Sequence, residues 1–347
     1  MAPPNDVVLV TGGTGFIGFA TLKRALEDGY TVRAAVRSEA KADNLRTNPS
    51  IKKYSSKLSF AVVPDILAPH AFDEAVKGVK YILHLASPLT TGISLEDDLD
   101  RLVVQVAVRG TIEVLESAAK EAGVKRIVIC SSIVAIVPVE SLTGAQAPDH
   151  AFRPEERAHD VPGPYPAVIV AYVQSKIAAL KDAEAWVEKE KPSFDVIHIH
   201  PSFVGGRNDL ARNFEELKTG TNFYFLAPVL GQEAATAAGP RVASYVDVDD
   251  VAKAHVLSLN EKVAGNQSFM LSGEGEMSWD GAKAIAAKHF PDAVGKVFPN
   301  DGESAPFPFS VPADNSKTVE TFGKLRTYEE TVKAVVGQYI ELSQQAA

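Results

Sequence analysis

The chain has 347 residues, of which 46% are hydrophobic and 23% charged, and an excess of acidic side chains gives it a formal net charge of −9. These proportions are typical of a globular protein with one large or two smaller domains. The acidic balance disfavours nucleic acid and anionic membranes as partners, because both attract basic surfaces. One cysteine excludes an intrachain disulfide. We find no secretion signal, no organelle address and no apolar run of about 18 residues, so we expect a cytoplasmic protein.

The first 200 residues alternate short β-branched runs with longer helical patterns, which is typical of a parallel sheet built from β–α–β units. Most of the strand candidates are continuously apolar, as expected when helices cover both faces of a sheet. The predicted strands are residues 7–11, 31–36, 58–62, 81–85, 126–131 and 195–200. The predicted helices are residues 16–28, about 102–122, and 168–190. The predicted fold class is α/β, with a Rossmann-type doubly wound parallel sheet.

Beyond residue 200 the pattern becomes rich in loops, with one predicted helix near 211–218. We expect residues 243–246 and 251–259 to form a strand and a helix that return to the main sheet. The final predicted helix, about 328–343, begins with a capping box formed by Thr327 and Glu330. We therefore expect two domains. The first is a Rossmann-type domain of residues 1–200 and 243–262, and the second is a smaller, mixed α/β lobe of residues 201–242 and 263–347 on the C-terminal side.

A glycine-rich turn joins the first predicted strand to the first predicted helix. Its spacing is Gly12-x-x-Gly15-x-x-Gly18, and glycines let the backbone approach a diphosphate at the helix N-terminus. A plain structural turn is the alternative, but the strand–turn–helix context favours a dinucleotide site. Arg37 and Lys41 follow the second strand, where an NAD site needs an acid. Because a guanidinium suits a 2′-phosphate, NADPH (or NADP+) is the predicted cofactor.

Further cofactor contacts are expected where the third and fourth predicted strands end. Asp65 is placed to meet the adenine amino group. Leu85, Ala86 and Ser87 would pass the middle of the cofactor, where small residues allow close backbone approach.

The predicted catalytic set is Ser132, Tyr172 and Lys176. The tyrosine and the lysine lie four residues apart and therefore share one face of a predicted helix; an ordinary helix surface is the alternative. Reduction by hydride transfer needs a proton donor, and an ammonium beside a phenol stabilises its phenolate form. Ser132 follows the fifth strand, where it would polarise a substrate carbonyl. Ser131 is the weaker candidate, because neighbouring residues of a strand point to opposite faces.

Together these motifs resemble the extended short-chain dehydrogenase/reductases, which are NAD-dependent epimerase/dehydratase-like proteins. Within them the chain is similar to the branch of dihydroflavonol reductases and fungal methylglyoxal, aldehyde and carbonyl reductases. The resemblance covers essentially the whole chain. It implies a cofactor site formed by Gly12, Thr14, Gly15, Phe16, Ile17, Gly18, Arg37, Lys41, Asp65, Ile66, Leu85, Ala86, Ser87, Tyr172, Lys176, Pro201 and Val204. Leu89, Val134, Phe203 and Phe223 are expected to face the substrate.

The sequence is compatible with three functions. The first is reduction of a hydrophobic aldehyde, ketone or keto ester, favoured by the wholly apolar residues 133–137. The second is a nucleotide-sugar epimerase or dehydratase, in which Arg207, Arg212 and Arg241 could hold a diphosphate. The third is a non-catalytic NADP(H) sensor, which would have no need of the Tyr–Lys pair. The expected partner is a small-molecule carbonyl compound, and the expected state is a monomer or homodimer.

Two clusters of polar residues are expected to stabilise the fold and not to bind a ligand. His198 and His200 alternate onto one face of a predicted strand, but no nearby carboxylate or cysteine completes a metal site. Asp249 or Asp250 is expected to cap the helix that follows them. We expect no metal in this chemistry.

Overall fold

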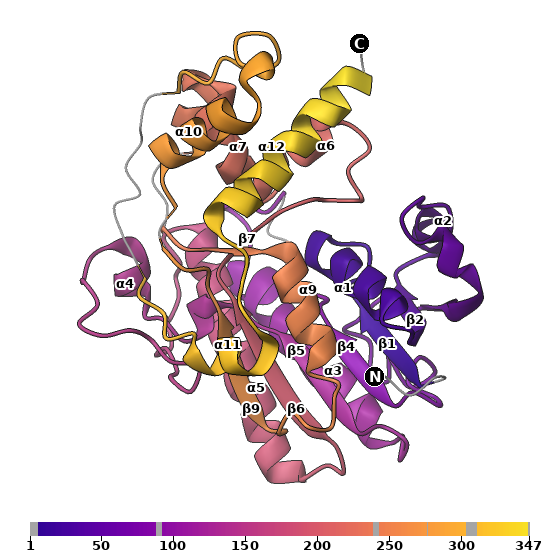
Figure 1. The fold of residues 1–347 in the computed structure, drawn as a ribbon. Coiled ribbons are helices and arrows are strands. Elements are labelled where there is room, and N and C mark those ends of the chain that lie inside the picture. Colours follow the sequence, from indigo (N-terminus) through magenta and orange to yellow (C-terminus); the bar gives the residue numbers. More distant parts are fainter. Residues whose placement is uncertain (1–5, 88–91, 239–242, 276, 303–310, 346–347) are drawn as a thin grey trace. The chain divides into compact units, whose positions relative to one another are not determined.

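The computed structural model describes residues 6–87, 92–238, 243–275, 277–302 and 311–345 (Figure 1). The chain divides into two compact units. The first comprises Met1–Val139, Arg153–His200 and Ala252–Phe269, and the second comprises Glu140–Phe152, Pro201–Val251 and Met270–Ala347. No helix among the described residues is long and apolar enough to span a membrane.

The main sheet has seven strands in the order β3-β2-β1-β4-β5-β6-β9. These strands are β1 (Val7–Thr11), β2 (Thr31–Val36), β3 (Leu58–Val62), β4 (Tyr81–His84), β5 (Arg126–Cys130), β6 (Asp195–Pro201) and β9 (Gln267–Leu271). Strands β1 to β6 pair in parallel. The strand order runs outward in both directions from β1 and β4, which confirms the Rossmann-type α/β fold.

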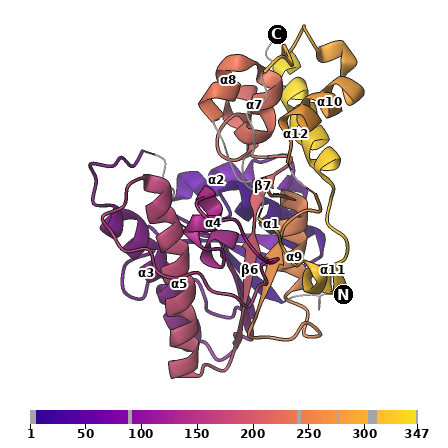
Figure 2. The same cartoon turned by 90° about the vertical axis from the view of Figure 1, so that its left-hand side faces the viewer.

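Helices cover both faces of this sheet. Figure 2 shows α3 (Val106–Ala119) and α5 (Val168–Glu190) side by side on one face, and α1 (Phe16–Glu27) on the other. The predicted helix at 102–122 is divided, because a π-helical segment, Asp100–Gln105, precedes α3. The unit also contains α2 (Glu39–Arg46) and short 3-10 helices at Lys52–Lys57 and Ile133–Ala135. The six strands predicted in the first 200 residues are confirmed to within one residue at either end, whereas β9 was not predicted.

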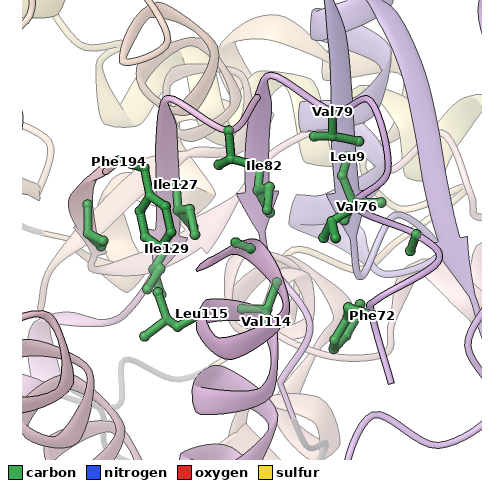
Figure 3. Close-up of a cluster of buried hydrophobic side chains, with 14 of the residues drawn as sticks. Leu9, Phe72, Val76, Val79, Ile82, Val114, Leu115, Ile127, Ile129 and Phe194 are labelled. Carbon is green, nitrogen blue, oxygen red and sulfur yellow. The ribbon is translucent and has the colours of Figure 1, made fainter. Parts of the chain in front are cut away.

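A cluster of fully buried side chains holds α3 against the sheet (Figure 3). Leu9, Ile82 and Ile127 come from three adjacent strands, and Val114 and Leu115 come from α3. Full burial of such a side chain contributes roughly 1.5–3 kcal/mol. The packing therefore fixes the strand ends, which carry the candidate site.

The second unit contains a two-stranded parallel sheet of β7 (Phe203–Gly205) and β8 (Tyr245–Asp247). Its helices are α4 (Val139–Thr143, which begins at the last residue of the first unit), α6 (Phe214–Leu217), α7 (Asn222–Leu230), α8 (Gln232–Ala238), α10 (Trp279–His289), a 3-10 turn at Pro291–Ala293, α11 (Ser316–Phe322) and α12 (Tyr328–Gln345). Helix α9 (Val248–Leu257) begins in this unit and ends in the first. Phe225, Tyr245 and Val335 lie in a common apolar core.

Two predictions about this region were wrong and one is confirmed. The strand expected at 243–246 pairs with β7 and not with the main sheet. Asp247, and not Asp249 or Asp250, caps α9, since its Oδ1 accepts a hydrogen bond from the backbone N–H of Asp249 at 2.9 Å. The capping box at α12 is confirmed, because the N–H of Thr327 donates to the Glu330 carboxylate (2.8 Å) and the N–H of Glu330 donates to Thr327 Oγ1 (3.3 Å).

Candidate active site

The glycine turn packs directly against the end of β4. Gly12 has a φ of +73°, and a Cβ at this position would lie 2.6–2.8 Å from backbone atoms of Leu85 and Ala86. The hydroxyl of Thr11 accepts hydrogen bonds from the N–H groups of Leu85 and Ala86, both at 3.1 Å. The turn thus needs glycine both for its conformation and for close packing of backbone on backbone.

Gly18 has a steric role at the same turn. A Cβ on Gly18 would collide with the carbonyl group of Gly12, whose carbon would be 2.6 Å away. Gly15, by contrast, is exposed, has an extended φ of −102°, and has room for a Cβ at ordinary contact distance. It occupies the N-cap position of α1, where it has no side chain to cap the first N–H groups, and the first turn carries no acidic residue. This helix end fits an anionic diphosphate, because unpaired N–H groups and the helix dipole favour negative charge there.

A hydrogen bond between Thr11 and His84 supports the glycine turn. Since Thr11 Oγ1 already accepts two hydrogen bonds, its own proton points to His84 Nδ1, 3.0 Å away. Burial, helped by the charge of Lys176, lowers the pKa of His84 to about 3 and keeps its ring neutral. Thr11 and His84 lie within two of the strands predicted above, but their contact joins residues 73 positions apart, and we did not predict it.

Arg37 and Lys41 are exposed beyond the end of β2. Neither side chain makes a hydrogen bond or ion pair with another residue in the described part of the chain. Arg46, by contrast, forms ion pairs with Glu39 and Asp43. The two free cations at the strand end suit a phosphate ligand.

The residues predicted beyond β3 lie at the same edge of the sheet. Asp65 is exposed, and its Oδ1 accepts a hydrogen bond from the N–H of Leu67 at 2.9 Å. Ile66 packs against α3 at Gly110, where a Cβ would approach its side chain to 3.0 Å. The small residue at 110 therefore lets α3 approach this loop closely.

Tyr172, Lys176 and Ser87 form the centre of the site. Helix α5 places the tyrosine one turn before the lysine, whose Nζ lies 5.8 Å from the centroid of the phenol ring. Lys176 is buried, with 8% of its surface exposed, and its Nζ donates a hydrogen bond to Ser87 Oγ at 3.0 Å. It makes no ion pair with any of the residues described. A buried ammonium with no carboxylate partner is costly, so Lys176 stays a candidate functional residue.

Ser132 follows β5 and begins the 3-10 turn Ile133–Ala135, which packs on α5. Its Oγ accepts a hydrogen bond from the N–H of Val134 at 3.4 Å. The hydroxyl proton is then left to donate elsewhere, as a group that polarises a carbonyl must. Ser131 instead extends the strand, since its N–H donates to the carbonyl of Ile199 at 2.8 Å.

The remaining predicted residues lie outside the described residues or in the second unit. Leu89 lies outside the described residues, while Pro201, Val204, Phe203 and Phe223 belong to the second unit. There Phe203 meets Tyr224 edge-on, with ring centroids 5.3 Å apart. Their roles toward cofactor and substrate stay predictions.

The arginines considered for a nucleotide sugar have carboxylate partners. Arg207 pairs with Glu341 and Asp209, and Arg212 pairs with Glu216. Arg241 lies outside the described residues. The described residues include no group of three or more side chains suited to hold a metal ion.

The sheet order, the glycine turn and the open N-terminus of α1 define a Rossmann-type dinucleotide-binding protein. The chain belongs to the NAD dependent epimerase/dehydratase family, whose sequence model matches residues 8–271. Ketoreductase CTB6 of Cercospora nicotianae is 41% identical, over 97% of this chain and 96% of its own length. The structure of yeast methylglyoxal/isovaleraldehyde reductase Gre2 complexed with NADPH is similar with a TM-score of 0.78, at 26% identity, covering 98% of this chain and 99% of that one. Gre2 of Candida albicans, solved with NADPH, has a TM-score of 0.77 at 25% identity and covers 98% of this chain and 99% of its own.

Proposed function

We propose that this protein uses NADPH to reduce a hydrophobic aldehyde, ketone or keto ester to the alcohol, with Tyr172 as the proton donor. Carbonyl reduction in general is supported by the relatives, which include a ketoreductase and an NADPH-bound methylglyoxal/isovaleraldehyde reductase. The observation that carries the residue assignment is the buried Lys176, which has no carboxylate partner among the described residues and lies one helical turn from Tyr172.

NADPH, when bound, supplies the hydride. The glycine turn and the N-terminus of α1 would hold its diphosphate, and Arg37 and Lys41 would hold its 2′-phosphate. The hydroxyl of Ser132 would donate a hydrogen bond to the substrate oxygen and draw electron density from the carbonyl carbon. The phenol of Tyr172 would deliver its proton to that oxygen. The ammonium of Lys176 would stabilise the phenolate left behind.

In this proposal Pro201 and Val204 add to the cofactor contacts made by residues of the first unit. Val134, Phe203 and Phe223 contact the substrate. That the protein works in the cytoplasm stays a prediction from the sequence.

A nucleotide-sugar epimerase or dehydratase is the second candidate, favoured by the family to which the chain belongs. The ion pairs of Arg207 and Arg212 argue against it, because those guanidinium groups are already neutralised. A diphosphate would have to displace carboxylates to bind there.

The test is the loss of NADPH absorbance with a panel of aldehydes, α- and β-keto esters and aryl ketones. NADH and UDP-sugars are run in parallel. We expect turnover of apolar carbonyls with NADPH and none of UDP-sugars. Conversion of a UDP-sugar would overturn the proposal in favour of an epimerase or dehydratase, and NADPH binding without any turnover would favour a sensor.

A further inference from the structure

The backbone around Ser132 receives a hydrogen bond from a side chain, because the backbone ladder between β5 and β6 ends just before it. Strands β5 and β6 pair through Cys130 and Ile199, and the last ladder bond runs from the N–H of Ser131 to the carbonyl of Ile199. The next residue able to continue this parallel ladder on β6 would be residue 201. It is a proline, which has no N–H. The ladder therefore ends immediately before Ser132.

The side chain of His200 contacts the backbone at this point. Its Nδ1 lies 3.3 Å from the carbonyl oxygen of Ser132, and its ring is fully buried. A carbonyl oxygen only accepts hydrogen bonds, so Nδ1 must carry the proton. Nε2 is buried with no hydrogen-bond partner among the described residues. Burial and the nearby His198 hold the pKa of His200 well below its ordinary value, which keeps the ring neutral.

Ser132 is consequently fixed at three points. Its carbonyl accepts from His200 Nδ1 and from the N–H of Ala135 (3.0 Å), and its hydroxyl accepts from the N–H of Val134. The carbonyl oxygen and Oγ of Ser132 both accept hydrogen bonds. The direction in which the hydroxyl proton points is therefore set by the backbone conformation at Ser132. Without the His200 contact, the Ser132 carbonyl would keep only the hydrogen bond from the N–H of Ala135.

We propose that His200 is a positioning residue, whose Nδ1–H holds the Ser132 carbonyl and thereby aims the Ser132 hydroxyl at the substrate oxygen. The inference rests on the proposed function, because the role given to His200 is exerted through Ser132.

The test compares three variants. His200→Leu removes the donor, His200→Asn retains an N–H donor, and His198→Leu is the matched control, since it replaces a buried histidine on the same face of β6. We expect His200→Leu to lower kcat about 10- to 100-fold, as misplacement of a reacting group does. KM and Kd for NADPH should stay within about twofold of the wild type. His200→Asn should recover most of kcat, and His198→Leu should retain it. Wild-type kcat in folded His200→Leu, or an equal loss in His200→Asn and His200→Leu, would overturn the proposal.

A second measurement needs neither a variant nor turnover. Proton–nitrogen NMR of the wild-type imidazole rings at pH 7 reports which ring nitrogen of His200 is protonated. We expect the neutral Nδ1–H tautomer. An Nε2–H tautomer or an imidazolium would overturn the inference even in a protein that reduces carbonyls. If no carbonyl is turned over, the proposed function fails while this structural result still stands.

Discussion

Replacing Gly18 with alanine tests how the glycine turn is built. Gly18 does not have a positive φ, so alanine is not excluded by conformation. The obstacle is steric, because the new Cβ would lie 2.6 Å from the Gly12 carbonyl carbon, where 3.4–4 Å is ordinary contact. The Gly12 carbonyl belongs to the backbone and the new Cβ is bonded directly to a Cα atom, so no side-chain rotation can relieve the contact. Overpacking of this kind costs roughly 1–3 kcal/mol, so we expect a lower midpoint of thermal unfolding. The displaced turn should also bind NADPH about tenfold more weakly, a loss of roughly 1.4 kcal/mol.

Gly15→Ala is the matched control for this substitution. Its Cβ would be 3.4 Å from the Gly12 carbonyl oxygen, an ordinary contact, and its extended backbone accepts alanine. Stability should fall by less than about 1 kcal/mol, because alanine is a poorer N-cap residue than glycine. The methyl group would still stand where a bound diphosphate approaches, so NADPH affinity should fall. Circular dichroism melts and NADPH fluorescence titrations separate the two effects. Unchanged melting and NADPH affinity in Gly18→Ala would refute the steric argument.

Three further predictions concern the first unit. Arg37→Asp should raise KM for NADPH more than KM for NADH in steady-state assays, and an unchanged preference would mean that Arg37 does not contact the 2′-phosphate. Burial lowers the pKa of His198 to about 4, so its neutral form contributes stability that is complete above about pH 6.5 and is lost as the pH falls toward 4. His198→Leu should therefore lose less stability than the wild type between pH 7 and 5, by on the order of 1–2 kcal/mol in urea unfolding; equal losses would contradict this. Arg126→Met should destabilise the protein by about 3 kcal/mol, because Arg126 is buried and binds Asp195 and two backbone carbonyls; an unchanged urea midpoint would contradict it.

The features predicted correctly from the sequence are those that depend on short stretches of chain. A strand such as β1 is a continuous apolar run, the glycine turn occupies seven consecutive residues, and the spacing of Tyr172 and Lys176 fixes them on one helix face. Each of these patterns has a local physical cause, whether burial, turn geometry or helical periodicity. The fold class follows from them, and so does the placement of Tyr172 and Lys176 on one helix face, whose catalytic role stays a prediction.

The features that were missed depend on contacts between distant residues. β9 is a short segment of mixed polar and apolar residues that pairs with β6, and β8 pairs with β7. The Thr11–His84 and Ser132–His200 contacts join residues 73 and 68 positions apart. No local periodicity encodes such pairs. The local motifs therefore predict a role for Ser132 but do not predict its contact with His200.

The most direct test of the central claim is the turnover of Tyr172→Phe, measured with NADPH and the best carbonyl substrate of the panel. This variant keeps the ring next to Lys176 and removes only the hydroxyl. We predict that kcat falls about 100-fold or more, within the range for loss of a general acid, while Kd for NADPH stays within about twofold of the wild type. Near-normal turnover in the folded variant would contradict the account, because the proton would then have to come from another group.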